Sequence, residues 1–163
     1  MHRFLLLICA LAVSSTAQAK YVSKVFGCKK GNVCVVHNNL GGDFGDYISA
    51  VTEIRKKETL LVIDGPCWSM CAAVADMVRP NTCITKNAYF GFHQVAWSEK
   101  GKPTYYTLPP RSRVTSEWNL KKGGYPIIGY NVMSFPETLD YWPLCAKVPF
   151  PRSDPRKSIT AAH

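Results

Sequence analysis

The chain has 163 residues, of which 20 are Lys or Arg and 11 are Asp or Glu, giving a formal net charge of +9 at pH 7. The basic residues are scattered, and no basic run is interleaved with aromatic residues as on a nucleic-acid stacking surface, so we expect no nucleic-acid partner. The length is that of one domain able to bury its own core.

Residues 1–19 have the pattern of a secretory signal peptide. A basic start, Met1-His2-Arg3, precedes an apolar run over residues 4–13, and the segment ends in the small-x-small sequence Ala17-Gln18-Ala19. The apolar run is much shorter than the ~20 residues that a bilayer-spanning helix needs, so we expect no stable membrane span. The sequence therefore predicts an exported protein, periplasmic or secreted, cleaved after Ala19.

Strand and helix patterns alternate between residues 20 and 94. Apolar alternation or short apolar runs predict strands, and apolar residues at helical spacing or a run of small residues before Pro80 predict helices. Strand, helix, strand at these intervals implies parallel pairing and right-handed crossovers, and hence an α/β fold. The expected strands cover residues 21–26, 33–37, 60–63, 82–85 and 89–93, and the expected helices cover residues 47–57 and 69–78.

The pattern is weaker beyond residue 94. Residues 98–113 are polar and contain Gly and Pro, which predicts an exposed loop. A short helix is expected over residues 114–121 and a last helical turn over residues 138–144. We expect residues 20–147 to form one domain and residues 148–163 to form a loose tail.

Six cysteines follow the signal segment: Cys28, Cys34, Cys67, Cys71, Cys83 and Cys145. An even number in an exported chain predicts disulfides. Cys28 and Cys34 flank a loop that can fold back as a hairpin, Cys67 and Cys71 can pair across a turn, and Cys83 and Cys145 then remain. Zinc is the alternative, but the chain contains neither a Cys-x-x-Cys nor a His-x-x-x-His pair, and we expect no metal or cofactor.

Two glycine-containing turns, Gly41-Gly42 and residues 65–69, each follow a predicted strand and lead into a predicted helix. The carboxyl ends of parallel strands meet at one sheet edge, so backbone N–H groups from both turns can converge on one oxygen, as an oxyanion hole requires. Ser69 opens a helix and His93 ends a strand, and these two side chains suit acyl transfer. Their ordinary roles would be a helix N-cap and a strand-end histidine.

At these residues the chain resembles the Clp protease proteolytic-subunit family of the Clp/crotonase superfamily, in its exported, periplasmic branch. That family has a glycine turn before a helix, a Gly-x-x-x-Ser-Met-x-Ala segment with the nucleophile, and a turn leading to a strand that ends in His-Gln. The resemblance covers roughly residues 33–95. The matching segments here are Asn38-Asn39-Leu40-Gly41-Gly42, Gly65-Pro66-Cys67-Trp68-Ser69-Met70-Cys71-Ala72 and Lys86-Asn87-Ala88 to His93-Gln94.

The resemblance implies a short, single-domain form of the Clp/crotonase β-α-β spiral and a serine peptidase acting on peptide or protein substrates. Ser69 would be the nucleophile, His93 the general base, and the amides of Gly42 and Met70 the oxyanion hole. Oligomers are common in that family, which makes a homo-oligomer a candidate assembly. A cytosolic unfoldase partner is not expected for an exported protein.

The family also has an acid well after the histidine. Asp140 is the candidate by position, with Glu117 as the alternative, although an ordinary surface role suits either carboxylate. His37 is expected to decorate a strand, and Asp64 to be a strand-end residue.

Two further interpretations remain open. The unassigned acid, Asp43 beside the glycine turn and the bulky Trp68 before the serine favour a catalytically degenerate, disulfide-stapled protein used for binding or as a scaffold. Thiol redox chemistry at Cys67 and Cys71 is the third interpretation, but their spacing differs from the Cys-x-x-Cys of thioredoxin-like proteins.

Overall fold

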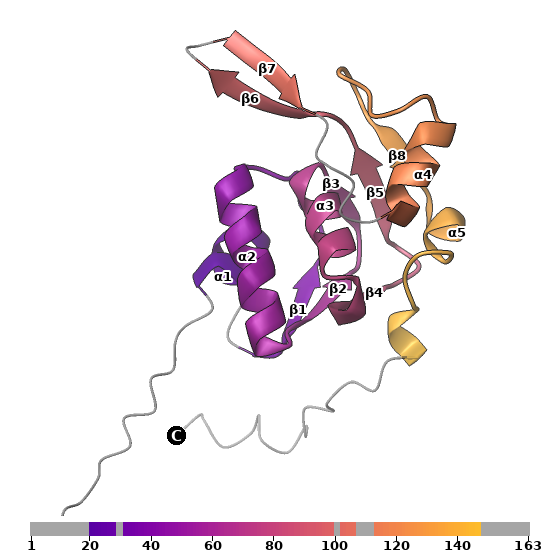
Figure 1. The fold of residues 1–163 in the computed structure, drawn as a ribbon. Coiled ribbons are helices and arrows are strands. Elements are labelled where there is room, and N and C mark those ends of the chain that lie inside the picture. The colour runs from indigo at the N-terminus through magenta and orange to yellow at the C-terminus, as the bar shows by residue number, and fades with distance from the viewer. Residues whose placement is uncertain (1–19, 29–30, 100–101, 107–112, 148–163) are drawn as a thin grey trace, which may run out of the picture.

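The computed structural model describes residues 20–28, 31–99, 102–106 and 113–147 (Figure 1). The predicted signal peptide over residues 1–19 and the predicted tail over residues 148–163 lie outside this part of the chain. The described residues form two three-stranded sheets with helices packed around them, and a separate two-stranded hairpin. The α/β class is confirmed.

The first sheet is parallel and has the order β1-β2-β4. Its strands are β1 (Val33–Val36), β2 (Leu60–Ile63) and β4 (Thr82–Ile84). The connections contain the helices α2 (Phe44–Lys57) and α3 (Met70–Met77), and a 3-10 turn, η1 (Arg79–Asn81), precedes β4. The predicted strands and helices of this region are all present, because short apolar strands alternate with helices that each bury one face.

The second sheet has the order β3-β5-β8 and is mixed. Its strands are β3 (Pro66–Trp68), β5 (Tyr89–Phe92) and β8 (Asn131–Met133). β3 pairs with β5 in parallel, and β8 pairs with β5 antiparallel. The sequence predicted β5 but neither β3 nor β8, since each of these strands has only three residues.

The predicted strand over residues 21–26 is wrong, because this segment is a helix, α1 (Lys20–Phe26). The side chain of Glu53 on α2 accepts hydrogen bonds of 2.9 Å from the backbone N–H groups of Tyr21 and Val22. These two amides lie in the first turn of α1, where N–H groups have no partner within the helix. Val22 and Phe26 lie one helical turn apart and are both buried.

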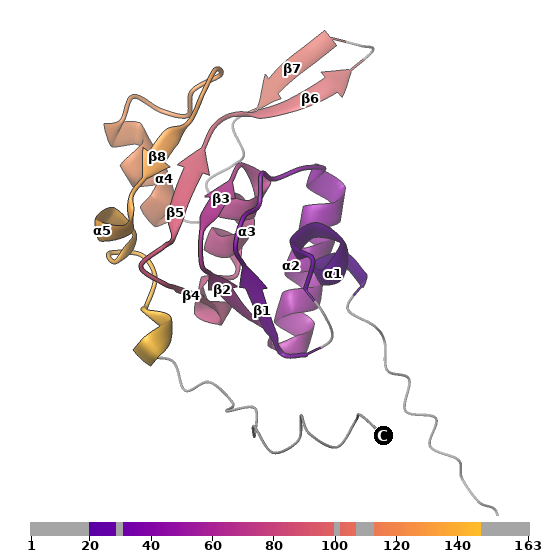
Figure 2. The same cartoon turned by 180° about the vertical axis from the view of Figure 1, so that it is seen from behind.

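The predicted loop over residues 98–113 is also wrong for most of its described length. β6 (Val95–Glu99) and β7 (Lys102–Tyr106) pair antiparallel, and this hairpin extends away from the rest of the fold (Figures 1 and 2). Pro103 suggested a loop, but β7 has β6 as its only described neighbour, and an edge strand tolerates the missing N–H of proline. α4 (Arg113–Lys121) confirms the predicted helix over residues 114–121.

The last predicted helical turn, over residues 138–144, is misplaced. A short helix, α5 (Phe135–Thr138), comes earlier, and a 3-10 turn, η2 (Cys145–Lys147), comes later. Ser134 and Glu137 form a capping box at the start of α5. This Ser-x-x-Glu signature fixes where the helix begins.

Most of the buried side chains form one core between the sheets and the helices. Its largest fully buried side chains come from both sheets, from α2 and α3, and from the carboxyl-terminal segment: Val36, Ile54, Leu61, Ile63, Val74, Ile84, Phe90, Met133 and Trp142. Trp142 stacks on Phe90 with a centroid distance of 4.3 Å and donates a hydrogen bond to the Ala75 carbonyl. The carboxyl-terminal segment therefore packs against β5 and α3.

All three predicted disulfides are present: Cys28–Cys34, Cys67–Cys71 and Cys83–Cys145. Disulfides persist in oxidising compartments, so they fit an exported protein. None of the helices in the described part of the chain is both long enough and apolar enough to cross a bilayer.

Candidate active site

Ser69 lies at the sharp turn between β3 and α3. Its backbone has a φ of 54° and a ψ of −123°, a conformation that costs a residue with a side chain about 1–3 kcal/mol. Its N–H donates to the carbonyl of Gly91 at 2.8 Å. The serine side chain makes no capping hydrogen bond to α3, so Ser69 does not fill the ordinary side-chain role of an N-cap.

The side chain of Ser69 instead meets His93, which follows β5. The distance between Ser69 Oγ and His93 Nε2 is 2.6 Å. In the tautomer with its proton on Nδ1, the imidazole accepts the serine hydroxyl hydrogen at Nε2. Burial lowers the pKa of His93, which favours the neutral imidazole that a general base needs.

The pairing of β3 with β5 explains how two residues so far apart in sequence meet. Trp68 on β3 lies opposite Gly91 on β5, and the strands are parallel. Ser69 therefore leaves the end of β3 where His93 leaves the end of β5. The sequence predicted a convergence of strand ends only for the two glycine-containing turns, so the meeting of Ser69 and His93 through β3 and β5 is an additional finding.

The glycine turn lies against the serine. Asn39 extends along the free side of β3: its N–H donates to the Pro66 carbonyl at 2.9 Å, and its carbonyl accepts the Trp68 N–H at 2.8 Å. Two residues later, Gly41 has a φ of 83°, and a Cβ there would lie 2.7 Å from Ser69 Cβ. Only glycine fits this position without displacing the serine.

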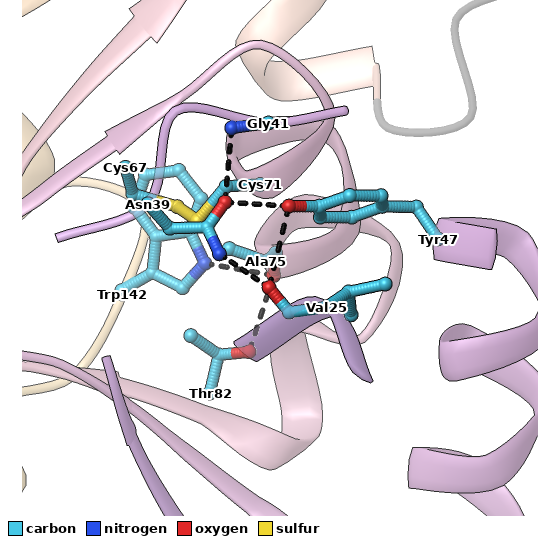
Figure 3. The surroundings of a disulfide bond; sticks show 9 residues. All are labelled: Val25, Asn39, Gly41, Tyr47, Cys67, Cys71, Ala75, Thr82 and Trp142. Atoms are coloured by element: carbon cyan, nitrogen blue, oxygen red, sulfur yellow. Dashed lines mark hydrogen bonds between the residues drawn. A yellow bond between two sulfur atoms is a disulfide. The ribbon is translucent and has the colours of Figure 1, made fainter. Parts of the chain in front are cut away.

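The side chain of Asn39 holds this turn in place (Figure 3). Its Oδ1 accepts hydrogen bonds from the Gly41 N–H at 2.9 Å and from the Tyr47 hydroxyl at 2.6 Å. Its Nδ2 donates to the Val25 carbonyl at 2.6 Å. Asn39 had no predicted role of its own, although an asparagine two residues before a glycine is typical of an Asx-turn.

The backbone N–H groups of Met70 and Gly42 are the predicted donors to an oxyanion hole. Met70 is the first residue of α3, where an N–H has no partner within the helix and the helix dipole favours negative charge. The Gly41 N–H is used by Asn39, whereas Gly42 makes no N–H hydrogen bond within the described residues. The assignment of Gly42 and Met70 as donors stays a prediction.

An aromatic wall borders the site. Trp68 contacts the Tyr130 ring at a centroid distance of 4.9 Å, and Tyr130 contacts the His93 ring edge-on at 4.8 Å. Gly91 makes room for this wall, because a Cβ at Gly91 would lie 1.7 Å from Trp68 Cε3. The sequence marked Trp68 only as a bulky residue before the serine. Tyr130 was not predicted, and it comes from the loop before the unpredicted strand β8.

The two candidate acids are both exposed. Asp140 is exposed in the turn after α5, its N–H donates to the Glu137 carbonyl, and no hydrogen bond joins it to His93 in the described part of the chain. The alternative, Glu117, is exposed on α4. The third member of a triad stays a prediction.

Asp43, which raised the concern of a carboxylate beside the glycine turn, caps α2. Its Oδ1 accepts the Asp46 N–H at 3.0 Å, so its charge interacts with the positive end of that helix. Cys67 and Cys71 are both 0% exposed and joined to each other, which does not favour thiol exchange with a substrate.

No protein-family model matches the sequence, and the search of curated proteins also gave no match. Among the described residues, no three His, Cys, Asp or Glu side chains come together as a metal site. Function is therefore inferred from the geometry of Ser69, His93 and the glycine turn.

Proposed function

We propose that this protein is a serine hydrolase that works by acyl transfer, with Ser69 as nucleophile and His93 as general base. The observation that carries the proposal is the 2.6 Å distance between Ser69 Oγ and His93 Nε2 at a strained strand-to-helix turn. A non-catalytic scaffold has no need for this arrangement, because a serine that only caps a helix would bond to the helix.

The reaction follows from these positions. Ser69 Oγ attacks the carbonyl carbon of the substrate while His93 Nε2 takes the hydroxyl proton, and the carbonyl oxygen becomes an oxyanion. His93 then gives that proton to the leaving group as the tetrahedral intermediate collapses to an acyl-enzyme. Water, deprotonated by His93, releases the acyl group and regenerates Ser69.

The N–H groups of Met70 and Gly42 are the proposed donors to the oxyanion. The support is that Met70 opens α3 directly after Ser69, and the glycine turn contacts the serine through Gly41. One donor of this kind contributes about 10²–10³-fold to the rate.

We further propose the Clp/crotonase-type spiral as the fold and peptides or proteins as the substrates. Support comes from the three motifs in the order that the resemblance requires, and from the two parallel strand pairs that end at the glycine turn and the serine. The exported location and a homo-oligomeric assembly are part of the same proposal.

The test is covalent labelling by a fluorophosphonate, which reacts with an activated serine. We expect the wild-type protein to be labelled at Ser69, as located by peptide mass spectrometry, and the Ser69→Ala variant not to be labelled. Ser49→Ala is the matched control, because Ser49 bonds only its own helix through the Gly45 carbonyl. Labelling of both wild type and Ser69→Ala, or of neither, would contradict the proposal.

A further inference from the structure

We propose that the Cys67–Cys71 disulfide is a positioning element of the active site, which holds Ser69 in the backbone conformation that brings its hydroxyl to His93. This inference rests on the proposed function, because it concerns the reactivity of Ser69. It assigns the disulfide a role beyond stapling the fold.

The disulfide closes a short ring with Ser69 at its centre. Cys67 and Cys71 lie two residues before and two residues after the serine, and their Cα atoms are 5.3 Å apart. The five-residue segment has to reverse its direction within that distance, and Ser69 makes the reversal with its positive φ. The bond therefore joins the strand before the serine to the helix after it.

Both ends of this bond are anchored in the fold. Cys67 pairs with Phe90 on β5 and forms an isolated bridge with Asn39 on its other side. Cys71 lies in the first turn of α3. The bond joins β3 to α3, and Asn39, which leads into the glycine turn, pairs with Cys67 beside it (Figure 3).

The strained conformation needs such a restraint. A residue with a side chain is more stable at negative φ, so a less restrained Ser69 would relax towards that region. Rotation about its backbone would swing Cβ and Oγ away from His93 Nε2 and would turn the Met70 N–H. A displacement of about 1 Å at a reacting group can lower a rate by about 10²-fold.

The other two disulfides were compared with Cys67–Cys71 to choose a control for its proposed positioning role. Cys83–Cys145 closes a long loop with a sequence separation of 62, and disulfides that close longer loops restrict the unfolded chain more. Cys28–Cys34 has a separation of 6, close to the separation of 4 in Cys67–Cys71, but it joins the segment after α1 to β1. It is therefore the matched control for the loss of a short loop.

The experiment compares Cys67→Ala/Cys71→Ala with Cys28→Ala/Cys34→Ala. Fluorophosphonate labelling over a concentration series gives a maximal rate and a half-saturating concentration, each corrected for the folded fraction measured by circular dichroism. We expect the maximal rate of the first variant to fall at least ~10-fold with little change in half-saturation, and the control to stay within about twofold of wild type.

A folded Cys67→Ala/Cys71→Ala variant that is labelled at the wild-type maximal rate would overturn the inference while leaving the hydrolase proposal in place. Absence of labelling in the wild type would overturn both. These two failures are therefore distinguishable.

If the variant does not fold, dithiothreitol treatment of the folded wild type replaces it. The dithiol passes two electrons to a cystine, giving two protein thiols and a cyclic disulfide, and differential alkylation with mass spectrometry measures each pair separately. A labelling rate that falls in proportion to reduced Cys67–Cys71 supports the inference. A rate that does not depend on that fraction overturns it.

Discussion

Two histidines of the described chain each follow a strand and each bind a polar partner, but their surroundings differ. His93 is half-buried and meets the hydroxyl of Ser69 at 2.6 Å. His37 has a side chain that is 74% exposed, and its Nδ1 lies 3.1 Å from a carboxylate oxygen of Asp64. One histidine has a serine hydroxyl as its partner, and the other has a carboxyl group.

The difference shows that the partner and its burial decide what a histidine can do. Burial lowers the pKa of His93, so it can accept a proton from the serine. Asp64 instead interacts with several donors, first with Thr85 and then with Asn87 and His37, and these lower the pKa of its carboxyl group. The contact between His37 and Asp64 is thus a polar surface contact that joins neighbouring strand ends.

Replacing each histidine by glutamine tests this comparison most strongly. His93→Gln removes the proposed base, and we expect the labelling rate of Ser69 to fall by about 10²–10⁴-fold. His37→Gln should leave that rate within about twofold and lower the free energy of unfolding by at most about 1 kcal/mol, because the contact with Asp64 is exposed to solvent. Equal loss of labelling in both variants would remove the distinction between the two histidines.

Replacing a glycine by alanine in each histidine region is the next test, and Gly65 is the glycine in the His37 region. A Cβ at Gly65 would lie 1.9 Å from the His37 carbonyl oxygen, so Gly65→Ala has to displace backbone. We expect it to lower the free energy of unfolding by about 3 kcal/mol, measured by urea titration, while folded molecules keep their labelling rate.

Gly41→Ala is the counterpart at the serine. The added methyl group would lie against Ser69 Cβ, and the positive φ of Gly41 disfavours alanine. We expect a loss of labelling rate per folded molecule of at least ~10-fold, since the proposed nucleophile is displaced. Wild-type labelling in folded Gly41→Ala would show that the glycine turn is not part of the site.

Two asparagines give a smaller, matched contrast. Asn39→Ala removes the hydrogen bonds to Gly41, Tyr47 and Val25, and we expect it to cost about 1–2 kcal/mol of stability and to slow labelling several-fold. Asn87→Ala removes a bond to Asp64 at an exposed position and should change neither quantity measurably. Thermal unfolding and labelling of both variants check this, and an Asn87→Ala effect on labelling would contradict it.

The central part of this fold was predictable because its signals are local. Short apolar runs marked β1, β2 and β4, and helical spacing marked α2. Ser69 and His93 followed from a serine at a strand-to-helix turn and a histidine at a strand end. The pairs Cys28–Cys34 and Cys67–Cys71 followed from their spacing, and Cys83–Cys145 was the pair that remained.

The remaining features depend on contacts between distant segments. β3 contains only three residues including Pro66, and it forms because Asn39 and β5 pair with its two sides. α1 is a helix because Glu53 on α2 satisfies two of its amides. Tyr130 reaches His93 through β8, whose pairing with β5 spans some forty residues of chain. None of these contacts leaves a pattern within a single window of sequence.

The labelling rate and the stability should depend on pH differently in the two histidine regions. These are the smallest effects that we expect. A protonated His93 cannot accept the serine proton, so labelling should fall on acidification, with its half-maximum below the ordinary histidine pKa of 6.5. Unfolded His93 binds a proton near that value and folded His93 only at lower pH, so the site also loses stability as the pH falls below 6.5.

The Asp64 region should respond only in more acid solution. Its carboxyl pKa is lowered from 3.8, chiefly by the hydrogen bond from Thr85, so its stabilisation is present above that pH and is lost as the pH falls through the lower folded value. We expect Asp64→Asn to remove this pH-dependent contribution to the free energy of unfolding, which is at most about 1 kcal/mol for a surface group. The pH dependence of Ser69 labelling should stay unchanged. A shift of the labelling midpoint in Asp64→Asn would mean that Asp64 acts on His93, and a midpoint at or above 6.5 in the wild type would contradict the effect of burial on the base.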